Sequence, residues 1–236
     1  MLIERRTYTL QPGMLNDFWD AQQLRSDGLS PILQRLIGAF APVSGMPESV
    51  VCLYRYDDFA DWQARLGGLS GETRLASYFG RVRSMILRQE NEFLVPSGLD
   101  RVTPMWGNGN DWLPAHGAPI PVSAQRAVVA ETSLTFRAGG VPRFWQAFAQ
   151  LGLADDASFA DGLLGAFNVT VGPLNRVRVY TRLTSLNDWV ARQDVQSWNG
   201  TWKSLMNELS PVLLDVTHAL LRPSPVADMS PMFIEP

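Results

Sequence analysis

The stretch VGPLNRVRVYTRLTSLNDW, residues 171–189, repeats in outline an earlier stretch, SGMPESVVCLYRYDDFADW, residues 44–62. In each stretch, a turn rich in Gly and Pro precedes an alternating strand, and the strand leads into a helix start that carries Asp-Trp. The two stretches begin 127 residues apart. One local plan written twice at a fixed distance indicates an internal repeat, and this repeat determines the expected fold.

Most of the chain follows the same repeat. Near the N-terminus the offset is 126 residues, which pairs Gly13 with Gly139, and after one inserted residue it becomes 127, which pairs Gly45 with Gly172. Further matches are the FW pairs at 18–19 and 144–145, the GAF triplets at 38–40 and 165–167, and the prolines at 96 and 223. Matched Gly, Pro and Trp residues at a nearly constant offset predict two copies of one structural unit.

Each copy shows the same order of expected elements. In the first copy, period-two alternation predicts strands at 2–10, about 37–43, 49–56 and 90–95. One helix is expected after Gly13, and another is expected to begin with Asp57 or Asp58 as its N-cap. The resulting β-α-β-β-α-β order is that of a ferredoxin-like unit.

A four-stranded sheet with helices on one face leaves its other face uncovered, and an apolar face of that size needs a partner. We therefore expect an α+β fold in which two ferredoxin-like domains pack sheet to sheet as an intrachain pseudo-dimeric α/β barrel, with exchange between chains as the alternative. Trp106 and Trp112 are expected to pack on these domains. The expected parts are domains at 1–97 and 127–225, a linker at 98–126 and a tail at 226–236.

Composition limits the classes of function. Apolar residues form 46% of the chain, the net charge is −3, and no stripe of Lys and Arg suggests a nucleic-acid partner. The single cysteine, Cys52, allows no intrachain disulfide. Because the N-terminal stretch MLIERRTYTL is charged by its fourth residue, we expect no secretory signal. No apolar run has the length of a membrane span. We expect a cytoplasmic protein. The sequence leaves open whether it forms a homo-oligomer.

Three passages resemble the NIPSNAP family. IERRTYTLQPGMLNDFW at 3–19 resembles its opening strand and helix, GPLNRVRVYTRLTSLNDW at 172–189 its third strand and helix, and RPSP at 222–225 its close. The resemblance covers about residues 1–97 and 127–225, and it implies the dimeric α/β-barrel fold. That superfamily includes small monooxygenases, haem-degrading enzymes and isomerases. The third strand of the family typically reads V-x-H-x-W-x-Y, and Cys52 and Val179 stand at its His position here.

Alternation along the first and third strands places six polar or aromatic side chains of the first copy on one face: Glu4, Arg6, Tyr8, Cys52, Tyr54 and Tyr56. Similarity to the barrel superfamily implies that this face points into the barrel, where its ligands bind. Arg6 would anchor a carboxylate or oxyanion, and the tyrosines would stack and donate hydrogen bonds. The equivalent positions of the second copy are mostly apolar: Ala130, Thr132, Leu134, Val179, Thr181 and Leu183.

The same residues allow a purely structural interpretation. Glu4 and Arg6 are i, i+2 neighbours that could pair at the barrel rim, and buried tyrosines are ordinary core residues. Cys52 is either a reactive thiol or a small buried hydrophobe, because activation requires a nearby cation or helix N-terminus. His218 is a candidate general base, since histidine titrates near neutral pH, but a satisfied histidine in a core or edge position is the commoner case. His116 in the linker is expected to be solvated.

Other chemistries lack their residues. Two histidines and one cysteine do not provide a usual zinc site, and no acidic loop has calcium spacing. The haem-degrading relatives use a His ligand from the second helix, and neither copy has one there. GGLSGE at 67–72 falls short of a nucleophile elbow, and GNG at 107–109 is not followed by a helix that could complete a phosphate cradle. We therefore expect neither a metal nor an organic cofactor.

Three functions follow as hypotheses. The leading one is the binding of a small, partly apolar ligand in the barrel interior, because apolar surroundings with a few convergent polar groups are typical of such sites. The second is a cofactor-independent monooxygenase or isomerase, as in the superfamily that the chain resembles. The third is a non-catalytic scaffold that binds a protein partner through its outer surface.

Overall fold

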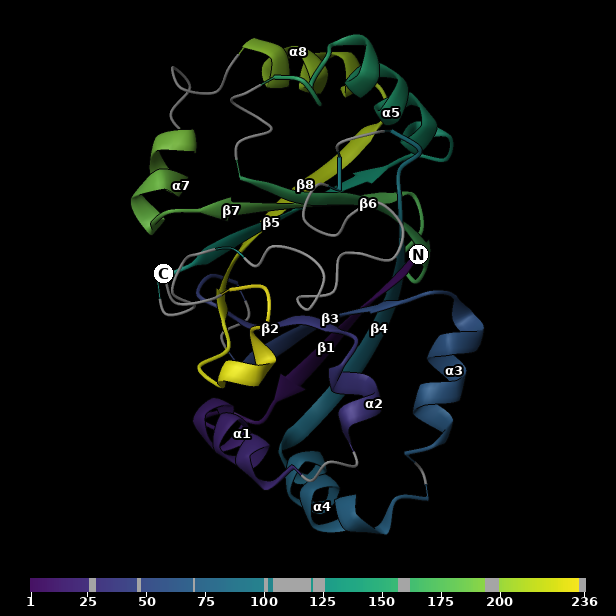
Figure 1. The fold of residues 1–236 in the computed structure, drawn as a ribbon. Coiled ribbons are helices and arrows are strands. Elements are labelled where there is room, and N and C mark those ends of the chain that lie inside the picture. Colours follow the sequence, from purple (N-terminus) through teal and green to yellow (C-terminus); the bar gives the residue numbers. More distant parts are fainter. Residues whose placement is uncertain are drawn as a thin grey trace.

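A computed structural model of the chain describes residues 1–25, 29–45, 48–69, 71–99, 102–103, 120, 126–156, 162–193 and 200–233. The expectations for Trp106, Trp112 and His116 fall outside these residues. The described residues form one closed barrel of strands with helices on two opposite sides of it (Figure 1).

The N-terminal half supplies strands β1 (Leu2–Leu10), β2 (Leu36–Pro42), β3 (Ser49–Tyr56) and β4 (Ile86–Pro96). Its helices are α1 (Leu15–Ala21), α2 (Ser30–Leu33), α3 (Phe59–Gly67) and α4 (Ala76–Met85), with short 3-10 turns η1 (Gln22–Leu24) and η3 (Thr73–Leu75). Asp58, one of the two predicted N-caps, caps α3 by accepting a hydrogen bond from the backbone N–H of Asp61. The fourth strand is longer than expected and begins directly at the end of α4.

The C-terminal half supplies strands β5 (Val128–Phe136), β6 (Leu163–Val171), β7 (Arg176–Leu183) and β8 (Leu213–Pro223). Its described helices are α5 (Gly140–Gln150), α7 (Leu186–Gln193) and α8 (Gly200–Leu209), and the 3-10 turn η4 (Ala227–Met229) follows β8. Two pairs of glycines aligned by the repeat adopt the same left-handed backbone: φ is 82° at Gly13 and 80° at Gly139, and 92° at Gly45 and 116° at Gly172. Residues with a side chain rarely adopt this conformation, so the matched glycines mark equivalent turns.

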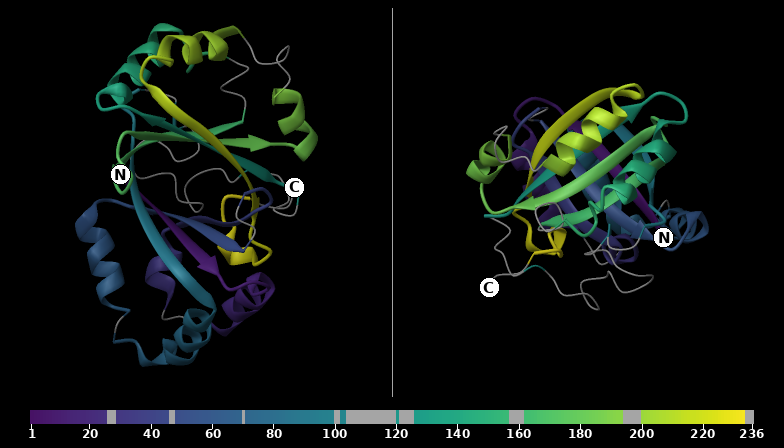
Figure 2. Two further views of the ribbon diagram at one scale, coloured as in Figure 1. Left: turned by 180° about the vertical axis from the view of Figure 1, so that it is seen from behind. Right: turned by 90° about the horizontal axis from the view of Figure 1, so that it is seen from above.

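The strands close the barrel in the order β1-β3-β2-β8-β5-β7-β6-β4. Every neighbouring pair is antiparallel, and the two halves join where β2 pairs with β8 and β4 pairs with β6. Figure 2 shows the strands between two groups of helices, with α1 and α4 on one side and α5 and α8 on the other. The expected α+β barrel of two ferredoxin-like domains is confirmed, and the two sheets come from one chain.

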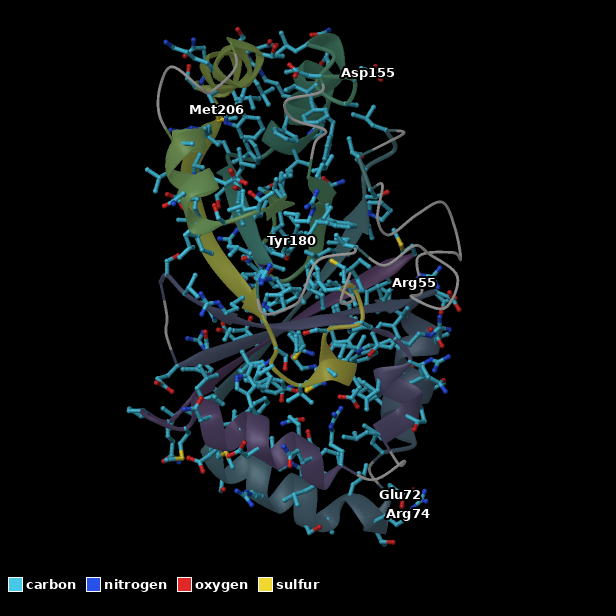
Figure 3. All side chains as sticks on the ribbon, turned by 60° about the vertical axis from the view of Figure 1, so that its left-hand side comes forward. Arg55, Glu72, Arg74, Asp155, Tyr180 and Met206 are labelled. Atoms are coloured by element: carbon cyan, nitrogen blue, oxygen red, sulfur yellow. The ribbon has the colours of Figure 1, made fainter. Side chains whose placement is uncertain are left out.

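Most of the buried side chains form three layers. One layer lies between the first sheet and its helices and contains Phe18 and Val82. A second fills the barrel interior and contains Leu53 and Tyr180, and Figure 3 shows Tyr180 between the two halves. The third lies between the second sheet and its helices and contains Phe144. Strand β3 is buried along its whole length, because its two faces belong to different layers.

Candidate functional site

The six predicted site residues lie on the face of β1 and β3 that meets the helices. Cys52 and Tyr54 pack in the same layer as Phe18 of α1 and Val82 of α4. The alternate side chains, among them Leu53, occupy the barrel interior. The expectation that this face points into the barrel is therefore wrong. Both faces of β3 are buried, so alternation could separate the two sets of side chains but not assign each to its side.

A cavity of about 260 Å³ lies between this face and the helices. Four of the six predicted residues line it: Arg6, Tyr8, Cys52 and Tyr54. Further lining residues that bear on its chemistry are Phe18, Tyr78, Phe79, Val82, Arg83 and Gln89. Ligand pockets commonly span about 300–1,000 Å³, so this cavity lies just below that range and has room only for a small molecule. The sequence-based prediction includes the lining residues of β1 and β3, but not those of β4 or of the helices.

Arg6 is held at the floor of the cavity by a buried ion pair with Glu4. Its Nε donates to Oε1 of Glu4 at 3.1 Å, and its Nη2 donates to both carboxylate oxygens at 2.9 Å. Its Nη1 donates to the Tyr8 hydroxyl at 3.2 Å. Burial would lower the pKa of this guanidinium, but the surrounding tyrosines and Glu4 raise the pKa well above its usual value. The Glu4–Arg6 pair expected in the purely structural interpretation does form. It lies between the sheet and the helices instead of at the barrel rim.

The tyrosines and the thiol around Arg6 are neutral at pH 7. Burial raises the pKa of Tyr8 and, more strongly, that of Tyr54. Tyr78 donates a hydrogen bond from its hydroxyl to Oε1 of Gln22 at 2.8 Å, and burial raises its pKa as well. Burial also raises the pKa of the Cys52 thiol to about 11, although Arg6 and Tyr54 oppose the shift. The floor therefore offers hydrogen-bond donors and polarisable groups but no thiolate.

We expect Cys52 to be inert toward alkylation in the native protein. The side chain is 1% exposed, and a thiol of pKa about 11 has on the order of a hundredfold less thiolate at pH 8 than an unperturbed one. Iodoacetamide labelling followed by mass spectrometry should therefore be at least about 100-fold slower in native protein than in urea-unfolded protein. Equal rates would contradict the buried, neutral thiol and revive Cys52 as a nucleophile.

The barrel interior holds a second charged cluster that the sequence analysis missed. Arg5 donates from Nε and Nη2 to the two carboxylate oxygens of Glu131 at 2.8 and 3.0 Å. Arg178 donates from Nη1 to Glu131 at 2.7 Å and from Nε and Nη2 to Glu92 at 2.6 and 2.7 Å. Two arginines and two glutamates thus form a continuous buried network that links β1 and β4 to β5 and β7. We call these four residues the interior network.

The interior network lies at the junction of the two halves. Arg5 and Glu131 are 126 residues apart, the offset that aligns the starts of the two copies, so equivalent positions meet across the barrel. Burial would raise the pKa of Glu131, but Arg5 and Arg178 outweigh burial and lower the pKa to about 2. The sequence carries one indication of this contact. The repeat aligns two residues of opposite charge, Arg5 and Glu131.

Comparison with known proteins identifies the half that carries the cavity. A model of the NIPSNAP family matches residues 3–99. The chain carries a NIPSNAP domain. An uncharacterised NIPSNAP domain protein of known structure from Burkholderia xenovorans is 29% identical over 42% of this chain and 97% of its own, with a TM-score of 0.39. No curated protein matches the chain. The second NIPSNAP-like domain, expected over 127–225, stays a prediction, as do the domain boundaries.

Two solved structures resemble the whole chain in fold. A candidate monooxygenase from Lactobacillus acidophilus NCFM is 10% identical, with 97% of this chain and 96% of that chain covered and a TM-score of 0.59. Another from Fusobacterium nucleatum subsp. nucleatum ATCC 25586 is 9% identical, with 94% and 92% covered and a TM-score of 0.62. At such identities the likeness concerns the barrel with its flanking helices, which extends beyond the NIPSNAP domain to the C-terminal half.

His218 does not line the cavity of the NIPSNAP domain. It lies exposed on β8 in the C-terminal half, where its Nδ1 is 3.0 Å from Oγ1 of Thr132 and its ring centroid is 4.9 Å from that of Trp189. Desolvation lowers its pKa, so the ring is neutral at pH 7. The two catalytic candidates, His218 and Cys52, therefore lie in different halves of the chain. They cannot act together on one molecule bound in this cavity.

The positions of the C-terminal half that correspond to the cavity floor are largely buried in its hydrophobic core. Leu134 and Val179 lie in the layer beneath α5 and α8, and Ala130 and Leu183 form a small cluster against Trp189.

Among the described residues, no group of three or more His, Cys, Asp or Glu side chains is arranged to hold a metal ion. Within the same part of the chain, no helix combines the length and the apolar character required to cross a membrane.

Proposed function

We propose that the NIPSNAP domain binds a small, partly apolar ligand in the cavity between its sheet and its helices. The observation that carries this proposal is the convergence of Arg6, Tyr8, Cys52 and Tyr54 on a single hollow whose other walls are largely apolar and aromatic. Apolar walls with a few fixed polar groups are the usual composition of small-molecule sites. This proposal retains the ligand-binding function predicted from the sequence. It places the binding site between the sheet and the helices instead of in the barrel interior.

The polar groups at the floor are prepared for hydrogen bonding to a ligand. The Tyr8 hydroxyl accepts a hydrogen bond from Arg6, so its own hydrogen is available to donate elsewhere. The bidentate pair with Glu4 and the contact of the guanidinium with the Tyr54 ring, 5.0 Å from its centroid, fix the position of Arg6. Preorganised donors of this kind lower the entropy loss on binding.

The alternatives gain less support. For a cofactor-independent monooxygenase or isomerase, the described residues that line the cavity include no thiolate and no histidine, so none of them is poised near pH 7 to accept a proton. A scaffold would be favoured by a barrel interior filled with side chains, and the described part of the interior does contain an apolar cluster and the interior network. The cavity between the sheet and the helices supports ligand binding more specifically than the filled interior supports a scaffold.

A cavity-filling substitution tests the proposal. Val82 lines the cavity from α4 and is 6% exposed, so Val82→Phe is expected to occupy part of the volume and to abolish binding. Native mass spectrometry and thermal-shift screening with a broad metabolite library should give ligands that bind the unmodified protein and not this variant. Ser84→Phe is the matched control, because Ser84 lies on the same helix, is exposed and does not line the cavity. Ligands that bind Val82→Phe as tightly as the unmodified protein would refute the site.

A further inference from the structure

The rim of the cavity carries an uncompensated positive charge. Arg83 of α4 is exposed, lines the cavity and has no carboxylate partner among the described residues. Its guanidinium carbon lies 4.7 Å from the centroid of the Phe79 ring, which also lines the cavity. A cation held over an aromatic face keeps a defined position. The described lining contains no Asp or Glu, so the field at the rim favours an anion.

The floor of the cavity is electrically neutral, in contrast to the rim. The charge of Arg6 is balanced by Glu4, which is fully buried directly behind it. A carboxylate placed at the floor would add a second buried negative charge beside Glu4, at a considerable cost in desolvation and repulsion. A neutral acceptor, such as a carbonyl or hydroxyl oxygen, could accept a hydrogen bond from Tyr8 there without this cost. An anionic group is therefore accommodated only at the rim.

Aromatic rings surround the space between floor and rim. Tyr8 and Phe18 lie 6.0 Å apart between ring centroids, and Tyr78 and Phe79 lie 5.4 Å apart. All four rings line the cavity, together with Tyr54. Aromatic side chains bind planar aromatic groups favourably through offset or edge-to-face contacts. The volume of about 260 Å³ suits one or two fused rings with a short substituent.

We infer that the ligand is a small aromatic carboxylate whose ring lies among these aromatic side chains and whose carboxylate is bound at the rim by Arg83 and Gln89. This inference rests on the proposed function and adds the chemical class of the ligand and its orientation. Gln89 is exposed near the start of β4 and lines the cavity, and its Nε2 donates one hydrogen to Oδ1 of Asn91 at 3.2 Å. The second N–H of this amide can donate to the same carboxylate. The class excludes amines and neutral hydrocarbons as preferred ligands.

Matched acids and amides test the inference. The probes are 2-naphthylacetate and phenylpropanoate, each paired with its uncharged amide, and affinities are measured by isothermal titration calorimetry at pH 7.5. The acids are expected to bind about tenfold more tightly than the amides, because a hydrogen bond to a charged group contributes more than a neutral one. Arg83→Gln should remove this difference by weakening the acids alone. Arg81→Gln is the control, since Arg81 is also exposed on α4 and does not line the cavity.

The outcomes separate this inference from the proposed function. If the amides bind as tightly as the acids, and Val82→Phe abolishes both, the cavity binds ligands and the preference for an anion is wrong. If the acids bind better but Arg83→Gln and Arg81→Gln weaken them equally, the carboxylate is not held at the rim and the orientation is wrong. If neither acids nor amides bind, the aromatic class is wrong, and a library screen without any ligand sensitive to Val82→Phe would overturn the proposed function as well.

Discussion

Glu131→Gln is expected to lower the free energy of unfolding by roughly 3–5 kcal/mol, because removal of one member of a buried ion cluster leaves the other charges uncompensated. Glu131 accepts hydrogen bonds from both Arg5 and Arg178, so its neutralisation leaves two buried guanidinium groups close together. Urea unfolding followed by tryptophan fluorescence at pH 7 measures the change. Glu90→Gln is the control, since Glu90 is half exposed and pairs with exposed Arg88, and a surface pair contributes at most about 1 kcal/mol.

The same residue makes a directional prediction for acid. The pKa of Glu131 is about 2 in the folded protein against 4.5 as its ordinary value, so the unfolded state takes up the proton first as pH falls. Its contribution to stability is fully present above about pH 5 and is lost as pH falls toward 2. The Glu131→Gln variant should therefore show a flatter dependence of stability on pH in this window. A loss below about 1 kcal/mol at pH 7, with an unchanged acid profile, would show that the interior network does not hold the halves together.

Arg6→Met is expected to destabilise the protein by roughly 3 kcal/mol, since it leaves the fully buried carboxylate of Glu4 without its cation. Asn91 still donates to Glu4 in this variant, but an amide does not balance the charge. The double variant Glu4→Gln with Arg6→Met should regain more than half of the loss, because the unpaired charge is gone. Chemical unfolding of the four proteins of this cycle gives the coupling energy between the two residues.

This coupling determines how ligand binding can be tested. If an Arg6 variant lost binding, the loss could result either from damage to the fold or from the missing contact with the ligand. Tyr8→Phe is the better probe of the floor, because it removes one hydroxyl and keeps the ion pair, at an expected cost of about 1 kcal/mol. If Arg6→Met proved as stable as the unmodified protein, the Arg6–Glu4 pair would be dispensable, and its role would be limited to binding.

The fold could be predicted from the sequence because the repeat supplies information that one sheet alone does not. The matched glycines and the two strand passages define equivalent units, and a sheet with one uncovered face requires the other unit as its partner. The strand at 49–56 appears in the structure as predicted, and Asp58 is the one of the two predicted N-caps that caps the helix. These features depend on local chemistry and on spacing, both of which are visible in a single sequence.

The orientation of the site could not be predicted in the same way. On β1, one face carries Arg6 and Tyr8 and the other carries Arg5 and Thr7, so both faces combine charge with a hydroxyl. Both faces are also buried, one by helices and the other by the opposing sheet. Polarity therefore does not distinguish them, and only three-dimensional pairing shows that Arg5 meets Glu131 while Arg6 meets Glu4. The contribution of Arg83 depends on the packing of α4 against β1, which alternation does not report.

Closure of the barrel within one polypeptide has a consequence for how this molecule can evolve. In an assembly of two identical subunits, each codon change alters both sides at once, and a residue near the twofold axis must tolerate its own copy. Here a single change alters one side only, which permits Arg5 to face a glutamate where a symmetric pair would set arginine against arginine. The two sides are thereby free to specialise, one toward a polar hollow and the other toward a filled core.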